Sequence, residues 1–478
     1  MTNTASAAAG VTILPSSVIS GLGHTPPSDK LNIAGIGVGG MGRANLRAMN
    51  SENIVALCDV DWKYAQNCFN DYPNAKKYWD WRKMYDEMGD SIDAVVIATA
   101  DHTHAITAAH AIAMGKHVYL QKPLTHTVYE SRLLTNLADK YKVATQMGNQ
   151  GASGEGVRIS SEWIQNGEIG EITKVEAFTD RPIWPQGLNA PENGMWVPDT
   201  LDWDLFVGPA QMRPYHAIYT PWNWRGWWDY GTGALGDMAC HILHPVYMGL
   251  GLKYPIKAQG TSTLLLTDSA PTAESVKITF PDRGKIGKVE MPEVDVYWYD
   301  GGIEPKKPEG WPAGKSMNNA GGGVIFHGTK DKLITGCYGR DPWLLSGREP
   351  NVPEKYRRIE LSHEMDWIRA CKESPENRVK PASSFDEAGP FNEMVVMGVL
   401  AVRLQDLNKE LEWDGEKMEF TNIGDQETIK TVIRDGFKIH DGHPTFDKTW
   451  TEPIPAKEFA NELIKHSYRD GWKLPDMP

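Results

Sequence analysis

The chain has 478 residues, of which 49 are Lys or Arg and 62 are Asp or Glu, so its formal net charge is −13 at pH 7. No basic run accompanies this acidic balance, which argues against nucleic acid and against an anionic membrane surface as partners. Nor does any run reach the roughly 18 consecutive apolar residues that cross a bilayer. A chain of this length is too long to form a single hydrophobic core, so we expect two domains of unequal size. The charge balance leaves small molecules as the expected partners.

The first 30 residues have a composition of their own. Residues 5–15 are mostly small and apolar, and a stretch rich in Ser, Gly and Pro follows to Pro27. This pattern is similar to the end of a secretory signal, although no Arg precedes the apolar part. We interpret residues 1–30 as either the remnant of an export leader or a disordered tail. The first interpretation predicts a periplasmic protein and the second a cytoplasmic one.

A glycine-rich segment follows the first apolar run, at residues 31–36. Gly37, Gly39 and Gly42 have G-x-G-x-x-G spacing, and a strand that enters a helix through such a loop is typical of a dinucleotide-binding fold. A second apolar run ends at Asp59, 17 residues beyond Gly42, where such folds place the carboxylate that binds the ribose. Because a carboxylate there repels the 2′-phosphate of NADP, we expect NAD as the cofactor.

Residues 31–153 are predicted to form one Rossmann domain. Short apolar runs alternate with helical patterns over this region, which indicates a doubly wound parallel sheet. After the first strand, the expected strands are 54–58, 77–78, 94–99, 117–120 and 143–147.

Residues 154–478 are predicted to form a second, α+β domain. A helix at 155–166 and a strand at 172–178 precede a long Pro- and Trp-rich region, and loops of that size are usually functional. Further strands are expected at 258–266, 274–280, 287–291, 295–299, 323–327 and 332–335. This succession of strands predicts a predominantly antiparallel sheet. Helices at 361–372 and 385–407 are expected to close the domain, and the tail from 414 carries few signals.

Reactive side chains follow two strands of the predicted parallel sheet. Thr99 and His102 lie where the strand 94–99 ends, and Lys122 follows the strand 117–120. All three are therefore expected at the carboxyl edge, where open α/β sheets bind ligands.

A second glycine-rich segment contains Asp237, His241 and His244. Positions i, i+4 and i+7 share one face if the segment is helical. An acid and an imidazole one turn apart could act as orienter and general base, since the pKa of histidine suits removal of a hydroxyl proton. The same residues could also form a metal site or belong to an ordinary helix. Because no H-E-x-x-H arrangement and no C-x-x-C pair accompanies them, we expect no metal.

The chain contains 18 Trp residues, which crowd between residues 184 and 228. Trp222, Trp224 and Trp227, together with Arg225, could form an aromatic-walled site for a sugar ring. The alternative is an aromatic cluster packed under a loop, and the sequence leaves both open.

Four motifs occur together in this chain: Gly37–Gly42, Asp59, Gln121–Pro123, and the segment of Asp237 and His241. In this combination the chain resembles the Gfo/Idh/MocA oxidoreductase family over about residues 31–407. The strings 201–209 and 224–231 are similar to longer, often exported members. The resemblance implies a Rossmann domain plus a large open-faced mixed or antiparallel sheet, and hydride transfer between sugars and a nicotinamide. It also implies a homo-oligomer, a dimer or tetramer, built through that sheet.

The resemblance assigns roles to individual residues. Lys122 matches the lysine near the nicotinamide and the reacting hydroxyl, His241 the acid/base histidine, and Asp237 the carboxylate before it. The implied cofactor-binding residues are Gly37, Gly39, Gly40, Met41, Gly42, Asp59, Thr99, His102, Gln121, Lys122 and Asn149. The implied substrate-side residues are Gln150, Trp222, Trp224, Arg225, Trp227 and His244. The chain departs from the family twice, since Gln121 replaces a usual Glu beside Lys122 and His244 stands where many members have a second acid.

The sequence thus predicts an NAD-dependent oxidoreductase that acts on a secondary alcohol of a sugar or glycoside. Two alternatives remain. One is a redox-neutral glycoside hydrolase that uses bound NAD for oxidation, elimination and reduction. The other is a sugar-binding module without catalysis.

Overall fold

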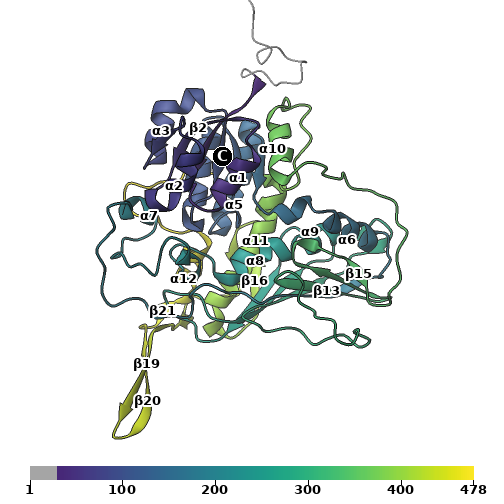
Figure 1. The fold of residues 1–478 in the computed structure, drawn as a ribbon. Coiled ribbons are helices and arrows are strands. Elements are labelled where there is room, and N and C mark those ends of the chain that lie inside the picture. Colours follow the sequence, from purple (N-terminus) through teal and green to yellow (C-terminus); the bar gives the residue numbers. More distant parts are fainter. Residues whose placement is uncertain (1–28) are drawn as a thin grey trace, which may run out of the picture.

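The computed structural model describes residues 29–478 (Figure 1). The interpretation of residues 1–30 as a leader remnant or a tail therefore lies almost entirely outside the described residues. Between residues 29 and 478, no helix is both long enough and apolar enough to span a bilayer.

The first domain is a parallel six-stranded Rossmann sheet, as the alternating pattern predicted. The strand order is β3-β2-β1-β4-β5-β6, and every pairing is parallel. The strands that follow β1 are added on one side of it (β2, β3), and the later strands are added on the other side (β4, β5, β6). The carboxyl ends of β1 and β4 are therefore the point where such sheets bind ligands. The strands are β1 (Asn32–Ile36), β2 (Asn53–Cys58), β3 (Lys76–Tyr78), β4 (Ala94–Ile97), β5 (His117–Leu120) and β6 (Thr145–Met147). The helices are α1 (Met41–Ala48), α2 (Trp62–Asp71), α3 (Trp81–Met88), α4 (His104–Ala113) and α5 (Val128–Tyr141).

The second domain is built on a nine-stranded mixed sheet with the order β15-β14-β13-β7-β12-β9-β8-β16-β17. β7 and β12 pair in parallel, and all other neighbours are antiparallel. The large open-faced sheet is thus confirmed, with one parallel pair inside it. The strands are β7 (Ile172–Thr179), β8 (Lys257–Ser262), β9 (Glu274–Phe280), β12 (Val294–Tyr299), β13 (Gly322–Gly328), β14 (Lys332–Gly336), β15 (Trp343–Leu344), β16 (Leu411–Asp414) and β17 (Glu419–Phe420).

One predicted strand of this sheet is wrong. Residues 287–291 contribute instead to a separate hairpin of β10 (Lys285–Ile286) and β11 (Val289–Glu290). Gly284 and Gly287 both have positive φ, a conformation that glycine adopts without strain, and they turn the chain too sharply for a long strand.

Helices lie on one face of the large sheet (Figure 1). They are α6 (Glu155–Gln165), α8 (Gly233–Ile242), α9 (His244–Gly249) and α11 (Phe385–Arg403). α11 lies directly on β8, because a Cβ on Gly260 would come within 2.5 Å of the backbone nitrogen of Val402. This packing places α8, with its Asp and His residues, between the large sheet and the first domain.

α10 (His363–Cys371) packs into the first domain, although it follows the second in the chain. Trp367 is fully buried in the same core cluster as Leu57 and packs edge-on against Tyr119 of the Rossmann sheet, and its indole nitrogen donates to the Ala144 carbonyl at 3.2 Å. The expectation that both helices of residues 361–407 close the second domain is therefore wrong for α10, which completes the core of the first domain.

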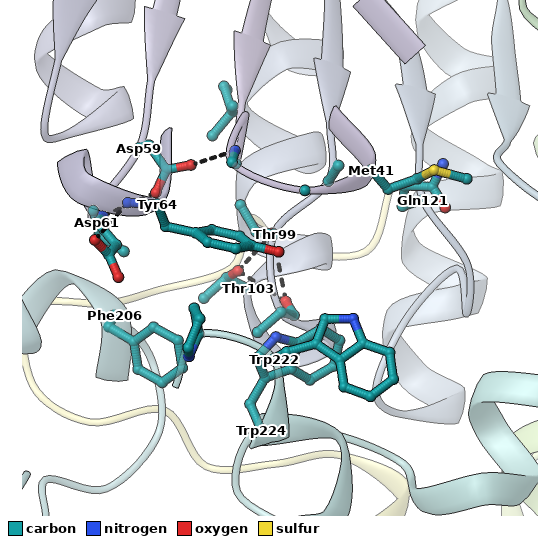
Figure 2. A pocket seen from close by; sticks show the side chains of 18 of the residues that line it. Met41, Asp59, Asp61, Tyr64, Thr99, Thr103, Gln121, Phe206, Trp222 and Trp224 are labelled. Carbon is teal, nitrogen blue, oxygen red and sulfur yellow. Dashed lines mark hydrogen bonds between the residues drawn. The ribbon is translucent and has the colours of Figure 1, made fainter. Parts of the chain in front are cut away.

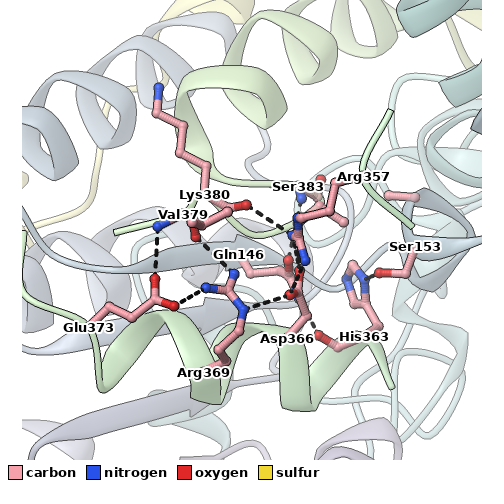
Figure 3. Close-up of polar contacts among 12 residues, drawn as sticks. Gln146, Ser153, Arg357, His363, Asp366, Arg369, Glu373, Val379, Lys380 and Ser383 are labelled. Carbon is pink, nitrogen blue, oxygen red and sulfur yellow. Dashed lines mark hydrogen bonds and ion pairs between the residues drawn. The ribbon is translucent and has the colours of Figure 1, made fainter. Parts of the chain in front are cut away.

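Polar contacts fix the start of α10 beside the end of β6 (Figure 3). His363 donates through Nε2 to the Met147 carbonyl (2.8 Å), and its Nδ1 lies 2.6 Å from the Ser153 hydroxyl. The buried Asp366 carboxylate accepts from Arg357 at 2.8 Å and from Arg369 at 3.1 Å. These contacts hold residues that follow β6 close to the carboxyl edge of the sheet.

The Pro- and Trp-rich region reaches back to the first domain. Its residues 200–207, which include α7 (Trp203–Val207), are called the strap below. The Asp202 amide donates to the Val60 carbonyl (2.8 Å), and the Trp62 amide donates to the Thr200 carbonyl (2.9 Å). The strap is thereby joined to the segment between β2 and α2.

The C-terminal tail, in which the sequence carries few signals, contains strands and a helix. It forms β18 (Thr428–Ile429), β19 (Val432–His440), β20 (His443–Trp450), β21 (Ile454–Pro455) and α12 (Ala456–Ile464). β19 and β20 form a hairpin that extends away from the body of the molecule (Figure 1).

Candidate active site

A cavity of about 570 Å³ lies at the carboxyl edge of the Rossmann sheet, between the glycine loop, the strap and α8. Figure 2 shows the side chains that line it. It contains Gly37 and Asp59 from the first domain together with Asp237 and His241 from the second. The predicted cofactor-binding residues and the predicted catalytic residues therefore line the same cavity.

The glycine loop needs its glycines for steric reasons. Gly37 has a φ of +76°, and a Cβ there would lie 2.6 Å from the Ala98 carbonyl oxygen. A Cβ on Gly42 would lie 2.2 Å from the carbonyl oxygen of Gly37. No side chain caps the N-terminus of α1, so its backbone N–H groups can bind the pyrophosphate of a dinucleotide.

Asp59 lies against this loop. Its Oδ2 accepts from the amides of Val38 (2.7 Å) and Gly39 (3.0 Å), and its Oδ1 accepts from the amide of Asp61 (2.9 Å). Burial raises the pKa of Asp59 to about 6, against the opposing effect of these three hydrogen bonds. A buried carboxylate at the end of β2 fits the ribose of NAD.

Tyr64 of α2 also points into the cavity (Figure 2). A Cβ on Gly39 would lie 2.1 Å from a ring carbon of Tyr64, and one on Gly40 would lie 2.8 Å from its hydroxyl. Glycine at these positions therefore leaves room for the ring as well as for a phosphate.

Apolar side chains wall the cavity beyond Asp59. They come from the first domain and from the strap: Val60, Trp79, Trp81, Leu201, Leu205 and Phe206. The His102 ring is held by the strap, since its Nε2 lies 3.0 Å from the Phe206 carbonyl and 3.1 Å from that of Val207. This end of the cavity suits the adenosine half of the cofactor.

Lys122, Asp237 and Arg225 form a charged group at the other end. Lys122 Nζ donates to the Asp237 Oδ1 at 2.7 Å and to the Asp237 carbonyl at 3.0 Å. Arg225 Nε donates to the same Oδ1 at 2.9 Å. Burial alone would raise the pKa of Asp237, but the charges of Lys122 and then Arg225 hold it well below its usual range. Asp237 is thus a carboxylate at neutral pH.

His241 lies one turn after Asp237 on α8, as the spacing predicted. Burial, and next the charge of Lys122, lowers the pKa of His241 to about 3. Its Nδ1 is buried, and no described residue hydrogen-bonds to it. The ring is therefore a neutral imidazole with a free nitrogen, as a general base requires. Among residues 29–478, the Asp237 carboxylate hydrogen-bonds to Lys122 and Arg225 and not to this ring.

Most predicted site residues line the cavity. They are Gly37, Gly39, Gly40, Met41, Asp59, Thr99, His102, Gln121, Lys122, Gln150, Trp222, Trp224, Arg225, Asp237 and His241. Gln121 turns its amide to Asn45 (2.9 Å) rather than toward Lys122. The negative charge beside Lys122 comes from the Asp237 carboxylate.

Four predicted residues, Gly42, Asn149, Trp227 and His244, lie behind the cavity lining. Asn149 is fully buried under α8, where its amide donates to His244 Nδ1 (3.0 Å). Trp227 is also fully buried and packs edge-on against Tyr219, so the packed-cluster alternative describes it. His244 is the first residue of α9, beyond the end of α8 at Ile242. It therefore does not continue the α8 helix face that carries Asp237 and His241.

Tyr338 was absent from the sequence-based site. It follows β14, lines the cavity, and its ring centre lies 4.7 Å from that of His241. Its φ of +63° is in the left-handed region, which is uncommon for an aromatic residue. No sequence motif marks Tyr338, because the contact joins residues 97 positions apart.

The described residues contain no metal-ligand cluster. Between residues 29 and 478, no group of three or more His, Cys, Asp or Glu side chains could hold a metal ion. All five Cys residues are buried and free.

Comparison with known proteins identifies both domains. Residues 31–149 match the oxidoreductase family model described as an NAD-binding Rossmann fold, and residues 168–295 match the C-terminal alpha/beta domain of the same family. Together the two matches cover slightly more than half of the chain.

Two curated relatives match part of the chain. A levoglucosan dehydrogenase from Pseudarthrobacter phenanthrenivorans is 27% identical over 164 residues, which are 34% of this chain and 34% of that protein. An alpha-N-acetylgalactosaminidase from Bacteroides fragilis is 30% identical over 169 residues, 33% of this chain and 39% of that protein. The matches thus span well under half the length of each relative.

A solved structure shares the fold across both domains. The WlbA dehydrogenase from Bordetella pertussis, solved with NADH and UDP-GlcNAcA, has a TM-score of 0.54 at 15% identity over 80% of this chain and 99% of that one. The glycine loop, the Asp59 carboxylate and the two matched domains lead to one conclusion. The chain belongs to the Gfo/Idh/MocA oxidoreductase family, and its first domain is an NAD-binding Rossmann domain.

Proposed function

We propose that the protein transfers a hydride between a secondary alcohol of a sugar or glycoside and NAD. The observation that carries this proposal is that Lys122, Asp237 and His241 line the same cavity as the glycine loop. The similarity to a levoglucosan dehydrogenase supports a sugar as substrate.

The loop residues and Asp59 are suited to hold NAD. Backbone N–H groups of Gly40 and Met41 at the start of α1 would bind the pyrophosphate, and Asp59 would accept from the ribose hydroxyls. Thr99, His102 and Gln121 line the space beyond them. When bound, the nicotinamide supplies the site that accepts or donates the hydride.

The remaining groups then handle the proton and the developing charge. His241, a neutral imidazole, takes the proton of the reacting hydroxyl. Lys122 donates a hydrogen bond to the same oxygen and stabilises its negative charge. Asp237 fixes the Lys122 ammonium at 2.7 Å, so its role is to position Lys122 rather than His241.

Aromatic residues form the substrate side of the proposed site. Trp222, Trp224 and Tyr338 line the cavity near Lys122, and sugar rings present apolar faces that pack on such side chains. Gln150 adds an amide for the sugar hydroxyls.

A redox-neutral glycoside hydrolase is the second candidate. Two observations favour it: the similarity to an alpha-N-acetylgalactosaminidase, and the strap that covers the adenosine end of the cavity. In this scheme a ring hydroxyl of the sugar would be oxidised to a ketone, with its hydride held on bound NAD. The aglycone would then leave by elimination, water would add across the resulting double bond, and return of the hydride would give the free sugar. The same Lys122 and His241 would serve both reactions.

Incubation of the NAD-loaded protein with aryl glycosides separates these functions. A keto-glycoside formed together with stoichiometric NADH supports the dehydrogenase. Free sugar and phenol without net NADH support the hydrolase. Binding of the glycoside with neither product would leave only a sugar-binding module and would overturn the proposal.

We infer further that the chain assembles into a dimer or tetramer through the large sheet. On the face away from α8 and α11, Lys174, Lys277 and Tyr297 stay partly exposed. Light scattering of the purified protein tests this inference, and replacing Tyr297 with a charged residue should reduce the mass to that of a monomer.

A further inference from the structure

The end of the cavity near Lys122 holds two cations for one carboxylate. Lys122 and Arg225 both contact Asp237 Oδ1, at 2.7 Å and 2.9 Å. The two side chains are only 13% and 17% exposed, so water and salt screen the surplus charge incompletely. This local positive balance contrasts with the net charge of −13 of the whole chain.

The neighbouring titratable groups compensate this surplus only in part. Burial raises the pKa of Asp101 to about 7, so that this carboxyl is about half protonated at neutral pH. It already accepts from the Thr232 hydroxyl at 2.8 Å. His241 is neutral, and Asp59 is bound to backbone amides of the glycine loop.

Arg225 is fixed in place before any ligand binds. Its guanidinium carbon lies 4.5 Å from the ring centre of Trp222 and 4.3 Å from that of Trp224. One terminal nitrogen donates to the Trp222 carbonyl at 3.1 Å, and the other has no hydrogen-bond partner among residues 29–478. A guanidinium held against two rings, with a donor nitrogen to spare, is well suited to bind a carboxylate.

We propose that Arg225 binds an acidic group of the substrate, so that the preferred sugars are uronic acids or similar acidic derivatives. This inference rests on the proposed function for the sugar itself, and on the charge balance for the acid. The pyrophosphate of NAD is the other anion near this cavity. The amides of Val38 and Gly39 already donate to Asp59, but the N-terminus of α1 with the amides of Gly40 and Met41 is available to the pyrophosphate.

The test measures binding of matched ligands to the NAD-loaded protein. Methyl gluco-, galacto- and mannopyranosides are compared with their uronates and with the uncharged methyl esters of those uronates, by calorimetry. At least one uronate should bind about tenfold more tightly than both of its uncharged partners, since charge-assisted bidentate bonds are the strong ones. The preference should weaken as salt is added.

Variants assign the effect to the guanidinium. R225Q should reduce the preference for the uronate to below about threefold, and R225K should keep part of it because the charge remains without the fork. R348Q is the matched control, since Arg348 pairs with Glu168 outside the cavity and its loss should leave the preference intact. If R225Q does not fold, R225K and the salt dependence decide the question.

Three results would overturn the inference. The first is that no uronate binds more tightly than its uncharged partners. The second is that the preference survives in R225Q. The third is that R225Q weakens NAD binding tenfold while the preference is unchanged. The last result would assign Arg225 to the pyrophosphate. NADH formation is recorded separately. Turnover of uncharged sugars without a preference for acids refutes this inference alone. Tight uronate binding without any redox product refutes only the proposed function.

Discussion

Tyr338 and His241 pack ring against ring, 4.7 Å apart, although they come from different elements of the second domain. Tyr338 holds this position from a left-handed backbone conformation with a φ of +63°. Such conformations cost about 1–3 kcal/mol for residues other than glycine and are concentrated at functional sites. Among residues 29–478 no group hydrogen-bonds to the Nδ1 of His241, and the Tyr338 ring packs against the imidazole.

The strain at Tyr338 predicts an inverted order of stability for two variants. Tyr338→Gly should be more stable than Tyr338→Ala by about 1 kcal/mol, because only glycine relaxes at positive φ. Both should lower kcat/KM about tenfold or more by freeing the His241 ring. Denaturant unfolding and steady-state kinetics measure the two effects. An alanine variant as stable as the glycine variant would show that the backbone at this position is unstrained.

Lys122 is expected to be essential for the chemical step. Lys122→Ala should lower hydride transfer by about 10³-fold, because no other donor replaces the ammonium at the reacting oxygen. NAD affinity should stay within about tenfold of the wild-type value, and Arg225 still pairs with Asp237. Single-turnover NADH formation and NAD titration measure these quantities. Turnover close to that of the wild type would remove Lys122 from the mechanism.

Asp59 should make NAD binding depend on pH. Its pKa in the folded protein is about 6, above the usual 3.8, chiefly because of burial. Its contribution to the stability of the cofactor-free protein is therefore present at low pH and is lost as the pH rises through 6. NAD binding needs the carboxylate, so the Kd should increase about tenfold per unit below pH 6.

Substitution at Asp59 tests this pH dependence. Asp59→Asn should bind NAD more weakly and without this dependence between pH 5 and 7, as measured by calorimetry. Asp139→Asn, which changes an exposed carboxyl on α5, should keep the wild-type profile. An unchanged profile in Asp59→Asn would assign the titration to another group.

Glu274 and Asp300 should make the fold less stable at higher pH. Burial raises the pKa of Asp300 to about 7, and burial followed by the charge of Asp300 raises the pKa of Glu274 well above its usual value. Because both values lie above those of the unfolded chain, stability is present at low pH and decreases as the pH rises through 7. The loss expected from Asp300 alone between pH 5 and 8 is about 3 kcal/mol, because each of roughly two pH units below its folded pKa contributes about 1.4 kcal/mol.

Glu274→Gln isolates the contribution of this pair. The variant should lose less stability over the same pH range, because one of the two buried acids no longer ionises. Urea unfolding at several pH values measures the difference. Asp101 and Glu130, whose pKa values burial raises to about 7, titrate in both proteins and cancel. Equal slopes for the two proteins would contradict the role given to the pair.

The first domain could be predicted almost completely from the sequence, whereas the edges of the second could not. Every strand of the Rossmann sheet was expected, and the buried strands β4 and β5 carry the continuous apolar runs typical of parallel sheets. Residues 287–291 misled because Val289 and Met291 alternate with Lys288 and Glu290, and this alternation is the same in a short hairpin as in a strand of the large sheet. α10 was placed correctly along the chain, but its packing of Trp367 on Tyr119 joins residues 248 positions apart.

The sequence by itself determined the glycine loop, Asp59, Lys122, and the helical spacing of Asp237 and His241. These depend on local sterics and on the periodicity of strands and helices, which act over a few residues. Only the tertiary structure decided that Arg225 shares Asp237 with Lys122, that Tyr338 packs on His241, and that Trp227 and His244 lie behind the cavity. Those outcomes depend on which distant side chains the packing of two domains brings into contact, and no local pattern specifies that.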